Sequence, residues 1–101
     1  MSRCRLQLRV IRSFAHRGLK RLYERDDASG IRPDLLGKVR TILAQLDDAQ
    51  IIDDMRTPSF RLHALRGDLK GYWSVTVKAN WRIVFKFVDG DASNIELLDY
   101  H

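Results

Sequence analysis

The chain has 101 residues, 45% of them hydrophobic and 31% charged, which is typical of one small domain. No apolar run approaches the roughly 20 residues that a membrane-spanning helix needs, and the single cysteine, Cys4, excludes an internal disulfide and suits a reducing compartment. The formal net charge of +5 favours a polyanionic partner, nucleic acid first, although many small domains are basic without binding one. We therefore expect a cytoplasmic domain that does not enter a membrane.

The N-terminal half predicts one strand and two helices. Apolar side chains are mixed with arginines over Leu8–Phe14, which indicates a strand. Ser13 can then cap a helix over about His16–Arg25, which the turn-like stretch Asp26–Gly30 ends. A second helix is expected over Pro33–Asp48, because proline suits a first turn and the apolar residues after it recur at helical spacing.

The C-terminal half predicts a sheet. Runs of β-branched and aromatic residues indicate four strands, at Arg61–Leu65, Tyr72–Val77, Trp81–Phe87 and Ile95–Tyr100. The order β-α-α-β-β-β-β predicts an α+β domain with two N-terminal helices packed on an antiparallel sheet. The expected core joins one face of the sheet to one side of the second helix: Trp73, Val75, Trp81, Ile83 and Phe85 against Leu36, Val39, Leu43 and Leu46.

Common catalytic and ligand-binding motifs are absent from the sequence. There is no P-loop, no glycine-rich dinucleotide motif, no CxxC pair and no HExxH zinc motif. One cysteine and three scattered histidines do not make a zinc-binding pattern. We therefore expect neither a metal nor a cofactor.

The strongest chemical candidates are two histidines at the ends of predicted strands, His63 and His101. The second ends the run Asp99-Tyr100-His101, and Arg82 and Lys86 share one face of a central strand because side chains there alternate. Cleavage of RNA by its own 2′-hydroxyl needs a base, an acid and cations for the phosphorane, and imidazole suits either proton transfer. A strand histidine is more often a packing residue, so these residues alone leave catalysis open.

Several short motifs in a fixed order resemble the HigB toxins of the RelE/ParE toxin–antitoxin superfamily. The likeness covers nearly the whole chain after Leu8, and its order and spacing are more specific than any one motif. The matching motifs are Ile11-Arg12-Ser13-Phe14, Gly18-Leu19-Lys20, Arg61-Leu62-His63, Gly67-Asp68, Gly71-Tyr72-Trp73-Ser74-Val75, Asn80-Trp81-Arg82-Ile83 and Asp99-Tyr100-His101.

The resemblance implies a microbial RNase (RelE-like) fold and metal-independent cleavage of mRNA in the ribosomal A site. It also implies neutralisation by a HigA-like helix-turn-helix antitoxin, with operator DNA bound only through that antitoxin. The implied catalytic residues are His63, Asp99, Tyr100 and His101, with Arg82 on phosphate; we add Arg66, Lys70 and Lys86 as further phosphate-binding candidates. We expect His63 on a strand next to the one that carries the C-terminal residues.

The sequence departs from the family pattern in two places. The family usually has lysine where Arg66 stands, and arginine keeps the charge but is a poor proton donor, so we expect Arg66 to stabilise charge. Residues Met1–Arg9 precede the usual family start, which falls at Val10. We therefore expect a dispensable N-terminal extension, produced by a misassigned start, and a toxin domain over Val10–His101.

One alternative function shares the same fold. ParE-type relatives poison DNA gyrase by binding it, without catalysis. A nuclease needs His63 and the terminal Asp99-Tyr100-His101, whereas a binding protein does not, so their presence favours the nuclease.

Overall fold

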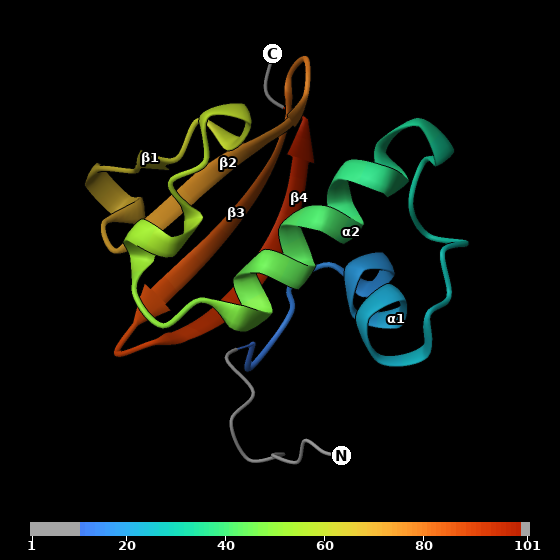
Figure 1. Cartoon of the computed structure of the whole chain (residues 1–101), viewed down its shortest axis with the longest axis horizontal. Coiled ribbons are helices and arrows are strands. Elements are labelled where there is room, and N and C mark those ends of the chain that lie inside the picture. Colours follow the sequence, from blue (N-terminus) through green and yellow to red (C-terminus); the bar gives the residue numbers. More distant parts are fainter. Residues whose placement is uncertain (1–10, 100–101) are drawn as a thin grey trace.

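Two helices follow one another in the N-terminal half of the computed structural model, which describes residues 11–99 (Figure 1). Helix α1 spans Arg17–Arg25, and the Nδ1 atom of His16 accepts the backbone N–H of Leu19 at 3.1 Å, so His16 is the N-cap. The prediction that Ser13 caps this helix is wrong, because the Ser13 hydroxyl accepts the N–H of Asn94 instead. Asp26 ends the helix in a left-handed conformation.

Helix α2 spans Pro33–Asp48, as the sequence predicts. It runs obliquely across one face of the sheet with α1 beside it (Figure 1). Its buried side chains recur at helical spacing: Leu35, Val39, Ile42, Leu43 and Leu46. Two short 3-10 helices that the sequence did not predict, η2 (Ile52–Met55) and η3 (Pro58–Phe60), then lead to the sheet.

Within residues 11–99 the sheet has four strands in the order β1-β2-β3-β4, and neighbouring strands are antiparallel. The strands are β1 (His63–Ala64), β2 (Tyr72–Lys78), β3 (Trp81–Val88) and β4 (Asp91–Asp99), and a 3-10 turn, η4 (Gly67–Leu69), lies between β1 and β2. Strand β1 is shorter than predicted because Arg61 adopts a left-handed conformation, which ends regular extension before His63. The predicted α+β fold is confirmed.

The predicted first strand is not a strand in its described part. Ile11 and Phe14 form only isolated parallel bridges, to Ala92 and Ile95 of β4. The backbone of β4 is left-handed at Asn94, between those two bridges, so a continuous ladder cannot form there. The rest of the predicted strand, Leu8–Val10, lies outside the described residues.

The core lies between the helices and one face of the sheet. Val75, Ile83 and Phe85 are fully buried, whereas Trp73 and Trp81 are partly buried and pack against the core from its margin. The connection after α2 contributes two further fully buried side chains, Met55 and Phe60. No helix in the described part of the chain is long and apolar enough to cross a membrane.

Candidate active site

The face of the sheet that points away from the helices carries three of the candidate residues, His63, Arg82 and Lys86. We call this surface the open face and define it by the alternation of side chains along each strand. Its members are His63 of β1, Tyr72, Ser74 and Thr76 of β2, Arg82, Val84 and Lys86 of β3, and Ser93, Glu96 and Leu98 of β4. The open face therefore carries four hydroxyl groups, two cations and one carboxylate, whereas the opposite face is mostly apolar. Ser74 and Val84, at the centre of the open face, are buried.

Register fixes the place of His63 on the open face. Its Cα partner is Ser74, which pairs with Val84, which in turn pairs with Glu96 of β4. Cross-strand partners point to the same side of a sheet, so these four side chains form one row. His63 is exposed at the β1 edge of that row, so its imidazole is accessible from solvent.

Arg82 and Lys86 project from the same face of β3, as the sequence predicts. They are four residues apart in the chain, which is about 13 Å along a strand. The Nη1 atom of Arg82 donates to the carbonyl oxygens of Ala79 at 2.7 Å and Trp81 at 3.3 Å, so the β2–β3 turn holds the guanidinium in place. Lys86 is exposed.

Arg66 and Lys70 flank the turn η4 in the connection from β1 to β2. Both are exposed, and Leu65 donates its N–H to the carbonyl of Tyr72 at 2.9 Å, which keeps the ends of this connection together. Gly67 and Gly71 have φ of 67° and 94°, a conformation that glycine adopts without strain. The two cations therefore lie near the sheet edge that carries His63.

Ion pairs occupy only some of the cations in the described residues. Arg40 pairs with Asp26 at 2.6 Å and Arg56 with Asp53 at 3.1 Å, whereas Arg17 and Arg25 of α1 form no ion pair there. The four candidate cations, Arg66, Lys70, Arg82 and Lys86, form no ion pair with any residue that the structure describes. The positive charge near the open face is thus left for an external anion.

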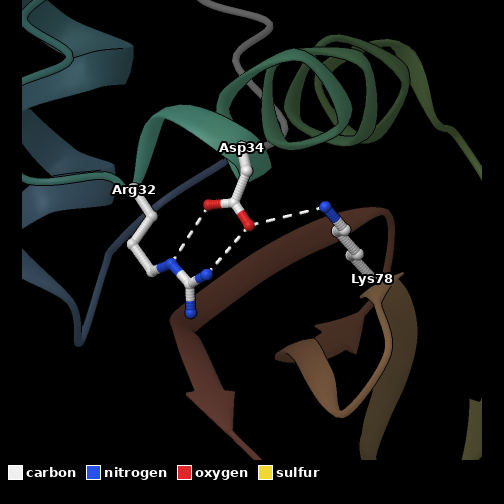
Figure 2. A network of polar contacts seen from close by, with 3 residues as sticks. All are labelled: Arg32, Asp34 and Lys78. Atoms are coloured by element: carbon white, nitrogen blue, oxygen red, sulfur yellow. Dashed lines mark hydrogen bonds and ion pairs between the residues drawn. The ribbon is translucent and has the colours of Figure 1, made fainter.

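A network of charged residues ties α2 to the β2–β3 turn (Figure 2). Asp34 accepts two hydrogen bonds from Arg32, at 2.9 and 3.0 Å, and pairs with Lys78 at 3.5 Å. Desolvation is the largest single influence on the pKa of Asp34 and raises it, but the hydrogen bond from Arg32 and the charges of Arg32 and Lys78 together lower that pKa below its ordinary value. The Arg32 guanidinium also lies 5.5 Å from the ring centre of Trp81, so the network braces the end of the sheet.

Asp99 lies at the same end of the sheet as this network. Its Cα partner is Trp81, so register directs it toward the helical side, opposite to His63. The prediction that His63 lies on a strand next to the last one is wrong, since β1 and β4 are the two edges and β2 and β3 separate them by about 14 Å. Tyr100 and His101 lie outside the described residues, so their roles stay a prediction.

Hydrogen bonds link three side chains on the open face, Ser13, Asn94 and Tyr72, and none of the three was predicted from the sequence as a site residue. The Nδ2 atom of Asn94 donates to the hydroxyl of Tyr72 at 3.1 Å, and its Oδ1 accepts from the Ser13 hydroxyl at 3.4 Å. Successive side chains of a strand point to opposite faces, so the prediction that Trp73 faces the core also implies that Tyr72 faces the other side. Nothing in the local pattern could have placed Asn94 beside it, because the contact crosses β3.

Comparison with protein families decides what kind of protein this is. Residues 12–101 match the family model HigB-like toxin, described as the RelE-like toxin of the type II toxin–antitoxin system HigB. The chain belongs to the HigB-like toxin family. This confirms the resemblance seen in the motifs, and a toxin of a type II system has an antitoxin partner.

Curated relatives extend the HigB likeness along nearly the whole chain. The protein is 42% identical over 92 residues to Endoribonuclease HigB of Proteus vulgaris, which covers 91% of this chain and 100% of the relative. It is 35% identical over 86 residues to Toxin HigB-1 of Vibrio cholerae serotype O1, which covers 83% of this chain and 90% of that relative.

Solved structures of YafQ from E. coli share the fold of this HigB-like toxin. The first, from strain BL21(DE3), has a TM-score of 0.60 at 16% identity and covers 88% of this chain and 90% of that chain. A YafQ mutant in which one histidine is replaced by glutamine gives a TM-score of 0.55 at 17% identity with the same coverage. At these identities the likeness shows the fold alone.

Two other kinds of site lie off the open face or are absent from the described residues. A cleft of about 380 Å³ between α1 and α2 is lined by Leu22, Tyr23 and Leu43 among others, on the helical side of this HigB-like toxin. Residues 11–99 contain no group of three or more histidine, cysteine, aspartate or glutamate side chains placed to hold a metal ion. The cations and the histidine of the open face therefore remain the candidates for chemistry.

Proposed function

We propose that the protein is an endoribonuclease toxin that cleaves mRNA in the ribosomal A site and so inhibits translation. The observation that carries the proposal is the open face, where exposed His63 lies among cations that have no acidic partner in the described part of the chain. The name of the Proteus vulgaris relative, an endoribonuclease matched over its full length, supports the same activity.

The proposed reaction is attack of the RNA 2′-hydroxyl on the adjacent phosphorus. A base takes the 2′ proton as the new O–P bond forms, and an acid protonates the 5′ oxygen as its bond to phosphorus breaks. The products are a 2′,3′-cyclic phosphate and a free 5′-hydroxyl, and no oxidant, metal or cofactor enters this balance. We assign one proton transfer to His63 and the other to Tyr100 or His101, and none to Asp99, whose side chain register directs away from the face that carries His63.

The cations stabilise the charge that develops on phosphorus. Arg82 is suited to this role because the Ala79 and Trp81 carbonyls fix its guanidinium before substrate binds. Arg66, Lys70 and Lys86 add exposed charges that can hold neighbouring phosphates. The guanidinium of Arg66 can bind phosphate through two hydrogen bonds but is a poor proton donor. We therefore propose that Arg66 stabilises negative charge on the phosphate.

We place the reaction on the ribosome, in the cytoplasm. A small open face has little surface with which to hold and distort a single RNA strand, and the ribosome would supply that positioning. The antitoxin is proposed to be a HigA-like helix-turn-helix protein, through which alone the complex binds operator DNA.

The test replaces His63 by alanine and maps mRNA cleavage in a translating extract with and without ribosomes. Because His63 is exposed, H63A should melt like the wild type and lose about a hundredfold or more in cleavage. Deletion of His101 should have a similar effect. The matched control is His16→Asn, which keeps a side chain able to cap α1 and should leave cleavage intact.

The same variants separate the nuclease from the gyrase-poisoning alternative. Growth inhibition that survives in H63A, together with loss of supercoiling by purified gyrase, would replace the nuclease by the ParE-like activity. Efficient cleavage of naked RNA without regard to codon would instead remove the ribosome from the proposal.

A further inference from the structure

We propose that Tyr72 is a stacking platform for one base of the single-stranded RNA substrate, held in place by Asn94. This inference rests on the proposed ribonuclease function and adds how the substrate is positioned. Tyr72 is the Cα partner of Lys86, so its ring lies on the open face beside an exposed cation.

The aromatic ring of Tyr72 extends across the surface of the sheet toward β4 and does not project into solvent. Tyr72 belongs to β2 and the Asn94 amide to β4, and the two strands are about 10 Å apart with β3 between them. Strand side chains usually project roughly perpendicular to the sheet, and a projecting tyrosine could not place its hydroxyl 3.1 Å from Asn94 Nδ2. One side of the ring therefore rests over β3, and the partly exposed side chain turns its other side to solvent.

A bulge in β4 brings Asn94 to this position. Two steps along β3, from Val84 to Lys86, match three steps along β4, from Ser93 to Glu96, so β4 carries one extra residue. Asn94 has φ of 53°, a left-handed conformation that asparagine tolerates better than most residues. Bulges often redirect a side chain, and this one directs the amide onto the open face.

Ser13 fixes which way the amide points. Its hydroxyl accepts the backbone N–H of Asn94 at 2.9 Å and donates to Oδ1 at 3.4 Å, which leaves Nδ2 to donate to Tyr72. Three segments, before α1, on β2 and on β4, thus hold one ring in a single orientation. A ring already held in its binding orientation loses little entropy when a base stacks on it.

Nucleic acid chemistry fits this arrangement better than a protein partner does. Proteins that bind single-stranded RNA combine aromatic rings, on which bases stack, with cations along the backbone path. On the open face the ring adjoins Lys86, and Arg82 lies further along β3. A base on Tyr72 would leave its flanking phosphates within reach of these cations.

The first experiment compares Tyr72→Ile with Tyr72→Phe in cleavage of mRNA on programmed ribosomes. Isoleucine keeps a side chain suited to a strand but removes the ring, and we expect KM to rise about tenfold or more with kcat little changed. Phenylalanine keeps the ring and should retain most activity. The matched control is Tyr23→Leu, which removes a tyrosine hydrogen-bonded to Asp47 on the helical side and should leave KM unchanged.

The second experiment reads stacking directly and does not need cleavage. A 2′-O-methyl oligoribonucleotide containing 2-aminopurine cannot undergo 2′-hydroxyl attack, and its fluorescence falls when the base stacks. We expect the wild type and Tyr72→Phe to quench it and Tyr72→Ile not to. Asn94→Gly, which keeps the left-handed backbone but removes the amide, should quench partially.

These outcomes separate the platform from the function on which it rests. Wild-type KM in Tyr72→Ile, alongside an inactive H63A, would overturn the platform and leave the nuclease standing. If the wild type cleaves nothing, the quenching experiment still decides the platform, and absence of quenching overturns it. Weakened neutralisation by the antitoxin with unchanged KM would assign the ring to a protein contact and would also overturn it.

Discussion

Gly18 lies where α1 passes close to the backbone of the α1–α2 connection. A Cβ atom at this position would come within 2.6 Å of the Gly30 carbonyl oxygen, and backbone cannot move aside as a side-chain tip can. A Cβ atom at Gly37, an exposed position on α2, would meet no other atom within 4 Å. Two glycines, each within a helix, are thus required to different degrees.

Alanine substitution should separate the two glycines in a denaturant melt. Gly18→Ala should lower the free energy of unfolding by about 1–3 kcal/mol, because the backbone must shift to admit the methyl group. Gly37→Ala should raise it by about 0.5–1 kcal/mol, because alanine loses less entropy on entering a helix. Equal effects at the two sites would show that the close approach to Gly30 is not maintained in solution.

Removal of single cations should change how binding depends on salt. For single-stranded RNA, each phosphate that a variant no longer neutralises reduces the slope of log affinity against log salt by about 0.7. Lys86→Ala and Arg66→Ala should each show that reduction with a non-cleavable 2′-O-methyl oligonucleotide at low ionic strength. Arg56→Ala, which removes a cation paired with Asp53, is the control; an unchanged slope in both test variants would remove these cations from the binding surface.

Strand β3 supplies the centre of the core through Phe85. The ring is fully buried and lies 6.4 Å from that of Phe87 in an edge-on arrangement. Phe85→Ala should therefore cost about 3–5 kcal/mol in the free energy of unfolding, since it removes a large buried side chain and leaves a cavity. A cost well below 1 kcal/mol in a denaturant melt would place this ring at the surface.

The Arg32–Asp34–Lys78 network should make the attachment of α2 to the sheet depend on pH. The folded state lowers the pKa of Asp34 below its ordinary value of 3.8, so the unfolded chain takes up a proton first as pH falls. The stabilising contribution is complete above about pH 5 and is lost as pH falls through the folded pKa. Thermal melts should show Asp34→Asn to be less stable than wild type at pH 7, with the difference shrinking toward pH 3; a constant difference would contradict this.

Periodicity predicts the elements well and their ends less well. Helix α2 and strands β2 and β3 follow from apolar spacing, because each buries one side against the core. Serine is a good capping residue, which favours Ser13 as the cap of α1, but that serine is engaged by Asn94 of β4, and His16 caps instead. The ends of these elements depend on contacts between segments far apart in the sequence, and such contacts cannot be read from local residue spacing.

The candidate site could be predicted in part for the same reason. Alternation along β3 is enough to place Arg82 and Lys86 on one face. It does not give the order of the strands, so the sequence places His63 beside the last strand when two strands separate them. The bulge at Asn94, which brings its amide to Tyr72, also breaks the period on which the prediction depends.

The molecule as a whole separates two kinds of surface. The helical side holds ion pairs such as Arg40–Asp26 and the cleft between α1 and α2. The open face and the adjoining β1–β2 connection hold the four candidate cations, which have no acidic partner in the described residues. An antitoxin on the helical side would leave the open face accessible, whereas one on the open face would block it. Protection of Lys86 or of Arg40 from chemical modification in the complex distinguishes the two.

The bridges from Ile11 and Phe14 to β4 join the first and last described segments of the chain. The other strand pairings of residues 11–99 join strands that follow one another in the sequence, so those hairpins can form from nearby residues, whereas this closure requires β4. Synthesis proceeds from the N-terminus, so β4 is made after every other strand. The proposed enzyme therefore cannot complete its fold, or begin to cleave RNA, before β4 has been synthesised and has paired with the segment that precedes α1.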